Sequence, residues 1–271
     1  MAHYFWLIPL GFIVGAFGTL IGAGGGFVLV PLLLLLYPQE NSEIITSISL
    51  AVVFFNALSG SAAYARMGRI DYKSGLLLSV ATIPGAILGA LTTSYIPRRT
   101  FDAILGLLLI AASALLILRP NKQKNSTPTE VDRGFSRRLV ETDGTEHTFS
   151  YNPILAISVS FLVGYFSSLL GIGGGIIHVP VLSQLLSFPV HIATATSHFT
   201  LAIMALAGTL VHIATGTFHH GVRRTIFLTV GVLVGAQLGA WLSNRVHSNW
   251  IIRGLAVALG FVGIHLLITV L

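Results

Sequence analysis

Long apolar stretches separated by short polar gaps dominate the chain. Most of them have the roughly 20 residues that a helix needs to cross the hydrocarbon core of a bilayer. The stretches cover about 5–36, 44–65, 74–95, 101–118, 152–186, 191–214, 222–243 and 250–270. This pattern predicts an all-α, polytopic membrane protein. The first stretch is too long for the apolar core of a cleaved signal peptide and is read as part of the mature fold.

The apolar stretches form two sets that match each other in sequence. Gly22–Leu32 recurs as Gly171–Val181, and Gly85–Ala90 recurs as Gly235–Ala240. Equivalent positions stay 148 to 150 residues apart over five separate motifs. This constant offset predicts two homologous repeats of about four hydrophobic segments each, an architecture that is frequent among secondary transporters.

A hydrophilic stretch, residues 119–151, separates the two sets. Its second part contains Asp143-Gly144 between β-favourable residues, which is a signal for a β-hairpin. The predicted organisation is therefore an N-terminal transmembrane repeat (1–118), a hydrophilic linker with a hairpin (119–151) and a C-terminal transmembrane repeat (152–271).

Composition and charge narrow the function. The chain is 54% hydrophobic and only 9% charged, whereas a soluble domain carries about 25% charged residues. The net charge of +6 comes mainly from loops and forms no basic stripe with aromatic residues, so a nucleic-acid partner is not expected. Cysteine, the H-E-x-x-H motif and paired carboxylates are all absent from the sequence. An enzyme, a metal site and a cofactor are therefore not expected.

The first segment of each repeat contains three consecutive glycines with a proline five residues after the last of them. Glycine costs about 1 kcal/mol in a helix relative to alanine, so the run predicts a broken or re-entrant segment. A new half-helix would begin near Phe27 and near Ile176, with free N–H groups and a positive dipole end. The candidate anion-binding glycines are Gly24, Gly25, Gly26, Gly173, Gly174 and Gly175.

Polar side chains inside the apolar stretches complete the candidate site. Hydroxyls are expected at the start of the second segments, and histidine is the one obvious titratable residue type within the spans. Two amide side chains are expected to line the cavity. The predicted substrate-binding residues are Thr46, Ser47, Thr196, Ser197, His178 and His198, and the predicted cavity-lining residues are Asn56 and Gln237.

The paired motif G-x-G-G-G-x-x-x-x-P, at Gly22–Pro31 and at Gly171–Pro180, resembles the sulfite exporter TauE/SafE family of membrane transporters. The resemblance covers essentially the whole chain except residues 119–151. It implies a secondary transporter that moves sulfite, a sulfonate or a related sulfur-containing anion across the cell membrane, most consistently a bacterial inner membrane. The repeats and glycine runs alone indicate a small anion bound at the midplane between repeats, without identifying it.

Several alternatives stay open at this stage. An anion channel, or a transporter of an anion unrelated to sulfur, would use the same site. The two repeats run parallel if the first segment of each crosses fully, and they are inverted if that segment is re-entrant. Besides the lipid bilayer and a small anionic substrate, a homo-oligomeric partner and coupling to protons are both compatible with the sequence.

Overall fold

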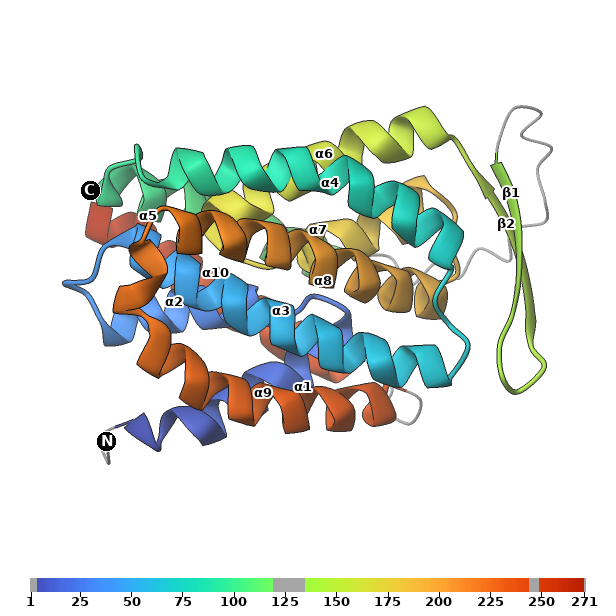
Figure 1. Cartoon of the computed structure of the whole chain (residues 1–271), viewed down its shortest axis with the longest axis horizontal. Coiled ribbons are helices and arrows are strands. Elements are labelled where there is room, and N and C mark those ends of the chain that lie inside the picture. Colours follow the sequence, from blue (N-terminus) through green and yellow to red (C-terminus); the bar gives the residue numbers. More distant parts are fainter. Residues whose placement is uncertain (1–3, 119–134, 244–248, 271) are drawn as a thin grey trace.

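The computed structural model describes residues 4–118, 135–243 and 249–270, and these residues are mostly helical. Ten α-helices occur in these ranges (Figure 1). Their bounds are α1 (Leu7–Ile21), α2 (Gly26–Leu36), α3 (Ser42–Arg66), α4 (Tyr72–Thr93), α5 (Arg98–Leu118), α6 (Pro153–Leu170), α7 (Gly175–Pro180), α8 (Val190–Ala214), α9 (Val222–Leu242) and α10 (Asn249–Val270). A π-helical turn (Val181–Leu185) extends α7, and a 3-10 turn (Thr217–His220) precedes α9.

Five helices of the described part of the chain, α3, α4, α6, α8 and α9, are long and apolar enough to cross a membrane. Their outward faces carry large apolar side chains, such as Leu76, Val80 and Val234, of which more than half is exposed. Contact of such outward-facing apolar side chains with lipid tails is favourable, whereas their contact with water is unfavourable. The sequence prediction of a helical, multi-pass membrane protein is therefore confirmed.

The pair α1–α2 begins and ends on the same side of the molecule. The ring of Tyr4, before α1, lies 6.1 Å from that of Phe227 in the second turn of α9. Glu40, after α2, pairs with Arg224 in the first turn of α9. Both ends of α1–α2 therefore lie where α9 begins, at the left of Figure 1.

The pair α6–α7 has the opposite orientation. Tyr151, directly before α6, packs against Phe188, which follows the π-helical turn, with ring centroids 5.1 Å apart. Both ends of this pair lie at the hairpin end of the molecule, at the right of Figure 1. The two broken segments thus enter the bundle from opposite ends.

Glycines allow each broken segment to pack closely on a helix of the other half. A Cβ at Gly235 would overlap the carbonyl oxygen of Phe12, so α1 and α9 touch backbone to backbone. A Cβ at Gly85 would overlap the carbonyl oxygen of Phe161 in the same way, where α4 meets α6. Small residues are what such close helix contacts in membranes require.

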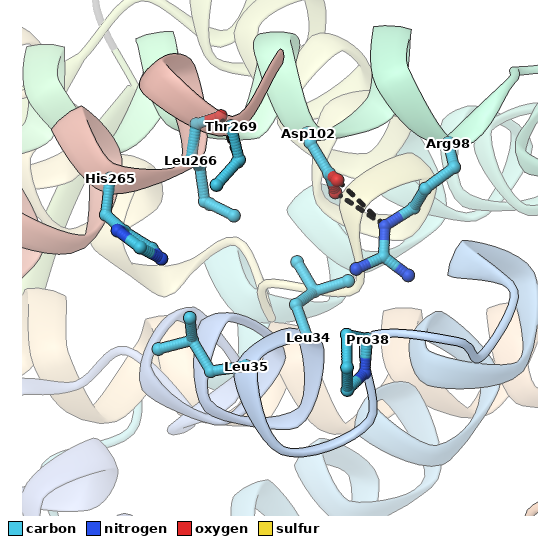
Figure 2. Close-up of a pocket in the computed structure, with 8 residues that line it drawn as sticks. All are labelled: Leu34, Leu35, Pro38, Arg98, Asp102, His265, Leu266 and Thr269. Carbon is cyan, nitrogen blue, oxygen red and sulfur yellow. Dashed lines mark hydrogen bonds and ion pairs between the residues drawn. The ribbon is translucent and has the colours of Figure 1, made fainter.

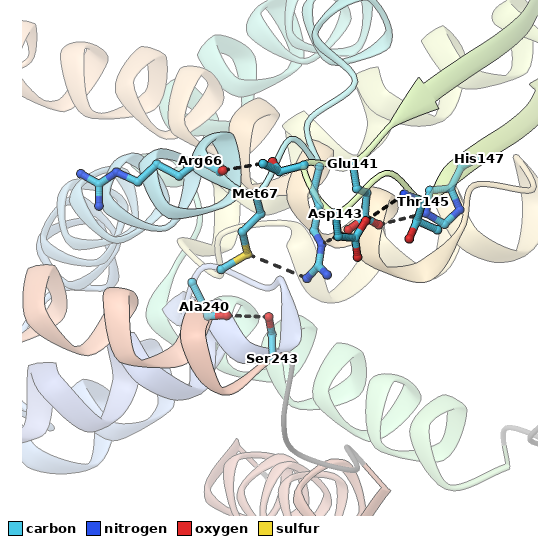
Figure 3. A network of polar contacts seen from close by, with 10 residues as sticks. Arg66, Met67, Glu141, Asp143, Thr145, His147, Ala240 and Ser243 are labelled. Atoms are coloured by element: carbon cyan, nitrogen blue, oxygen red, sulfur yellow. Dashed lines mark hydrogen bonds and ion pairs between the residues drawn. The ribbon is translucent and has the colours of Figure 1, made fainter.

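A β-hairpin lies outside the helical bundle. Strands β1 (Phe135–Val140) and β2 (Glu146–Tyr151) pair antiparallel, with Phe135 opposite Tyr151 and Val140 opposite Glu146. Figure 3 shows its turn docked on the loop between α3 and α4, where Arg69 donates to Glu141 at 2.6 Å. The amide of Thr142 donates to the Met67 carbonyl at 3.1 Å, which fixes the hairpin to one end of the bundle.

Candidate anion-binding site

Glycine is required in both turns by backbone conformation. Gly22, Gly24 and Gly25 have φ angles of 82°, 75° and 79°, in the left-handed region that other residues rarely adopt. In the second turn Gly171 and Gly173 have φ angles of 68° and 78°, and Gly174 has 54°. Three left-handed residues within four positions end one helix and reverse the chain before the next helix begins.

The two glycine turns lie against each other inside the molecule. A Cβ at Gly26 would lie 2.6 Å from the carbonyl oxygen of Gly171, and a Cβ at Gly175 would overlap the carbonyl oxygen of Gly22. The two contacts are reciprocal, because Gly22 and Gly26 of one turn correspond in the sequence motif to Gly171 and Gly175 of the other. Gly26 and Gly175 are therefore required because a side chain would not fit there. The other predicted glycines, Gly24, Gly25, Gly173 and Gly174, are required by their positive φ angles.

Several backbone amides at the first turn are left without a partner. Ala23 and Gly24 both donate to the carbonyl of Gly18, at 2.8 and 3.1 Å. The amides of Gly25, Gly26 and Phe27 make no hydrogen bond to any group of the described residues, and all three residues are buried. They form the N-terminus of α2, which has 11 residues. Free amides and the helix dipole together favour a negative charge at this point.

A cluster of four buried polar residues lies beside the first turn. The Thr19 hydroxyl donates to Asn56 Oδ1 at 3.1 Å and contacts His198 Nε2 at 3.3 Å. The Tyr64 hydroxyl donates to the carbonyl of Thr19 at 2.9 Å. We call these residues, Thr19, Asn56, Tyr64 and His198, the first polar cluster; α1, α3 and α8 contribute to it.

Two polar atoms of the first polar cluster have no partner. Asn56 Nδ2 and His198 Nδ1 are both fully buried and make no hydrogen bond to any of the described residues. Asn56 Nδ2 lies 3.5 Å from the position that a Cβ would take at Gly25, so the amide faces the turn. A buried donor without a partner costs about 1–3 kcal/mol, and a bound anion would remove that cost.

The second glycine turn has different neighbours. Gly208, which matches Gly60 when the sequences of the two halves are compared, faces Ser168 and Leu50, whereas Gly60 itself faces Thr19 and His198. The residue that corresponds to Asn56 is Met204, which is buried. His212 corresponds to Tyr64, and neither of its ring nitrogens has a partner. We call Leu50, Ser168, Met204 and His212 the second cluster. Its polar side chains, Ser168 and His212, are also without a hydrogen-bond partner among the described residues, but no hydrogen bond joins them into a network. The helix beside it, α7, has only six residues.

The predicted hydroxyl pairs lie deeper in their helices than the sequence indicated. They were expected to open the second segments, but α3 begins at Ser42 and α8 at Val190, after Asn41 and Pro189. The hydroxyls of Thr46 and Ser197 are buried without a partner, whereas Ser47 donates to the Ile44 carbonyl at 2.7 Å.

Three further predicted residues already have partners. Thr196 accepts a hydrogen bond from the amide of Asp71 at 3.1 Å. His178 is buried and its Nε2 lies 3.3 Å from the Ser160 hydroxyl. Gln237 donates to the Ser59 carbonyl at 2.7 Å and thereby joins α9 to α3. The structure thus brings Gly25, Asn56 and His198 together, and keeps His178 and Gln237 in separate contacts.

Thr19 and Tyr64, which complete the first polar cluster, were not predicted from the sequence. A signal for Thr19 exists, since it is a hydroxyl inside an apolar run, three residues before Gly22, with Ser168 at the same place before Gly171. In the sequence, Tyr64 resembles an aromatic residue that anchors a helix at the membrane interface. Its hydrogen bond to the Thr19 carbonyl places it in the interior instead.

A pocket of 330 Å³ lies between α2, α5 and α10, away from the glycine turns (Figure 2). Its one cation, Arg98, donates to Asp102 at 2.8 and 2.9 Å and to the Glu40 carbonyl at 2.6 Å. Because Asp102 already neutralises Arg98, this pocket is a poorer anion site than the first turn. Within the described ranges, no three His, Asp or Glu side chains are grouped as metal ligands.

Comparisons with known proteins give a consistent result. The model of the family described as "Sulfite exporter TauE/SafE" matches residues 7–266. The chain is 31% identical to the "Probable membrane transporter protein YunE" of Bacillus subtilis, over 96% of each chain. It is 22% identical to the "Probable membrane transporter protein MJ0441" of Methanocaldococcus jannaschii, over 97% of this chain and 94% of the relative. No solved structure matches.

Proposed function

The chain belongs to the sulfite exporter TauE/SafE family of membrane transporters, and from this membership we propose that it is a secondary transporter of a small sulfur-containing anion. Sulfite, a sulfonate or a related organosulfur anion would cross the cytoplasmic membrane of a bacterium. The anion would be bound in the interior, beside the first glycine turn. The sulfur chemistry comes from the family, and the position comes from the geometry.

The observation that carries this proposal is the group of free donors at the N-terminus of α2. Three unpaired backbone amides and the unpaired Asn56 Nδ2 lie within one buried region. Close packing accounts for Gly26 and Gly175, yet it does not account for donors that remain without acceptors. An anion supplies acceptors and fits the positive end of the helix.

We further infer that the two halves are inverted repeats with re-entrant first segments. The opposite entry of α1–α2 and α6–α7 supports this, as does the reciprocal contact of the two glycine turns. In inverted repeats the substrate site lies near the midplane, and access alternates between the two sides. Gly25, Asn56 and His198 are buried, so the anion site that we propose is closed to both sides in the described conformation.

The charges support an orientation. Among the described residues, five basic side chains flank the hairpin end: Arg66, Arg69, Lys73, Arg137 and Arg138. The opposite end has Arg98, Arg99, Arg223 and Arg224. Basic loops stay preferentially in the cytoplasm, so we infer that the hairpin end is cytoplasmic.

The test is stabilisation of the purified protein by anions, compared across sulfite, sulfate, thiosulfate, methanesulfonate and chloride. Sulfur oxyanions are expected to raise the unfolding temperature in a saturable way, and chloride is the control. No shift with any anion would contradict the proposal. A shift with chloride alone would favour an anion unrelated to sulfur.

An anion channel is the alternative function that uses the same site. Reconstituted into liposomes, a transporter gives saturable anion uptake and exchange of labelled for unlabelled anion. A channel gives a conductance that rises with the driving voltage and does not saturate. Conductance without exchange would favour the channel.

A further inference from the structure

We propose that the protein carries one proton with each anion and that His198 Nδ1 holds this proton. The proposal rests on the anion site proposed above, and it names how that site is regulated by pH and which residue is responsible. It follows from hydrogen-bond directions within the first polar cluster and from the charges that surround it.

The hydrogen bonds around Thr19 fix the tautomer of His198. The Thr19 hydroxyl gives its one hydrogen to Asn56 Oδ1, at 3.1 Å. It can therefore only accept from His198, and the ring must carry its hydrogen on Nε2, 3.3 Å away. In the neutral ring Nδ1 is then an acceptor with a free lone pair, and it has no partner in the structure.

Among the residues that the structure describes, no charged side chain acts on the His198 ring. From α3, Tyr64 faces the ring edge-on with centroids 5.6 Å apart, and its hydroxyl is already bonded to the Thr19 carbonyl. From α1, Thr19 faces it, and the backbone carbonyl of Gly22 lies close enough to accept a hydrogen bond from a protonated ring nitrogen. Within the described part of the chain, Tyr64 is therefore the other titratable group in contact with the ring.

A bound anion would favour protonation of His198. The first polar cluster and the α2 N-terminus have donors but no formal positive charge, and the helix end supplies only about half of an elementary charge. A full negative charge in a buried site is costly unless it is paired. Addition of a proton to the Nδ1 lone pair turns the ring into an imidazolium, which supplies both the missing charge and an N–H donor.

The second cluster has a different set of side chains. At the position that corresponds to His198 it has Leu50, and at the position that corresponds to Asn56 it has Met204. His212, although buried with both nitrogens free, takes the place of Tyr64 and not of His198. We therefore assign one proton and one anion to the first glycine turn, where the histidine belongs to a hydrogen-bonded cluster.

The test uses methanesulfonate and thiosulfate, because both stay ionised between about pH 6 and pH 8, where histidine titrates. The dissociation constant is measured from stabilisation of the wild-type protein at several pH values. If each bound anion brings a proton, the dissociation constant increases by up to about tenfold per pH unit, since binding and protonation are linked. A dissociation constant that does not change with pH would overturn the proposal.

Flux measurements identify the residue. In liposomes that contain a pH-sensitive dye, methanesulfonate uptake by the wild-type protein is expected to bring protons with it. The variant His198→Gln should lose this proton flux and the pH dependence of binding, whereas His212→Gln, its matched control, should keep both. Proton flux that persists in His198→Gln would overturn the assignment.

Two outcomes separate this proposal from the proposed function. Binding of no anion at any pH contradicts the transport function itself. Saturable anion binding that is independent of pH contradicts only the proton. The pH series needs no variant, so it decides the matter even if His198→Gln does not fold.

Discussion

The two glycine turns have the same backbone and different surroundings. At the first turn the neighbouring side chains are Thr19, Asn56, Tyr64 and His198, joined by hydrogen bonds. At the second turn the corresponding side chains are Ser168, Met204, His212 and Leu50, and the polar atoms among them are unpaired. The features that the turns share explain how the chain reverses inside the bundle, and the features that differ indicate where the chemistry lies.

The two clusters also lie towards opposite ends of the molecule. Tyr64 is two residues before the end of α3, near the hairpin, whereas His212 is two residues before the end of α8, near the start of α9. The first polar cluster is connected to the hairpin through Asp71, whose amide donates to Thr196, two residues before His198. The polar half of the site therefore faces the end that we infer to be cytoplasmic.

The largest expected effect is a loss of stability when the close contact between the two glycine turns is disrupted. In Gly175→Ala the new Cβ would overlap the Gly22 carbonyl and lie 2.5 Å from the Cα of Ala23, which are backbone atoms that cannot move aside. We expect the free energy of unfolding to fall by about 3 kcal/mol or more. The control is Gly216→Ala, where φ is also positive (82°) but no atom lies within 4 Å, and where about 1 kcal/mol is expected. Thermal unfolding in detergent measures both, and equal losses would contradict the close contact of the turns.

The next effect concerns the connection between the hairpin and the first polar cluster. Arg137 pairs with Asp71, and only 1% of the Asp71 side chain is exposed. In Arg137→Ala this carboxylate is left unpaired, so we expect a loss of about 3 kcal/mol. Arg138→Ala is the control, because the Arg138–Glu146 pair is largely exposed, and no measurable loss is expected. If the two variants were equally stable, the buried pair would not anchor the hairpin.

The same ion pair predicts a pH dependence. Burial disfavours the ionised carboxylate of Asp71, but hydrogen bonds from Arg137 and Ser74 outweigh it and hold the pKa below its usual range. The stabilisation is therefore present above the unfolded pKa of about 3.9 and is lost as the pH falls through the lower, folded value. Acid unfolding of wild type and Arg137→Ala measures this, and the acid-side loss should be smaller in the variant.

Substitution of the corresponding residues Asn56 and Met204 tests whether the anion binds at the first turn rather than at the second. In Asn56→Leu the anion loses a donor, and a hydrogen bond to a charged group contributes about 1.5–3 kcal/mol, so anion affinity should fall at least about tenfold. Met204→Leu should change affinity little, because Met204 offers no donor. Similar losses in both variants would mean that the two turns bind the anion equally.

The smallest effect is expected at Gln237, which the sequence placed in the cavity lining. Its amide nitrogen donates to the carbonyl and the hydroxyl of Ser59, at 2.7 and 2.9 Å. Gln237→Leu should therefore reduce stability by about 1 kcal/mol and leave the anion affinity unchanged. A tenfold loss of affinity with unchanged stability would instead place Gln237 in the site.

Much of the fold was accessible from the sequence because it depends on local properties. The apolar stretches predicted the spanning helices, since hydrophobic length is read from consecutive residues. The three-glycine runs predicted interruptions of the first segments, and the structure has Gly22–Gly25 between α1 and α2. The Asp143-Gly144 pair lies in the turn between β1 and β2. Residues of the candidate site were harder to select, because a buried hydroxyl such as Thr19 looks the same in sequence whether or not it has a partner.

The sequence by itself determined the membrane class and the family, and it predicted a glycine turn in each half, because hydrophobicity and backbone preference belong to each residue and its neighbours. Only the tertiary structure decided that α1–α2 and α6–α7 enter from opposite ends and that the two turns touch. It also decided that Asn56 and His198, 142 residues apart, meet through Thr19. Such contacts depend on how distant helices pack, which no local pattern encodes. The difference between the two glycine turns therefore became visible only when their neighbours were in place.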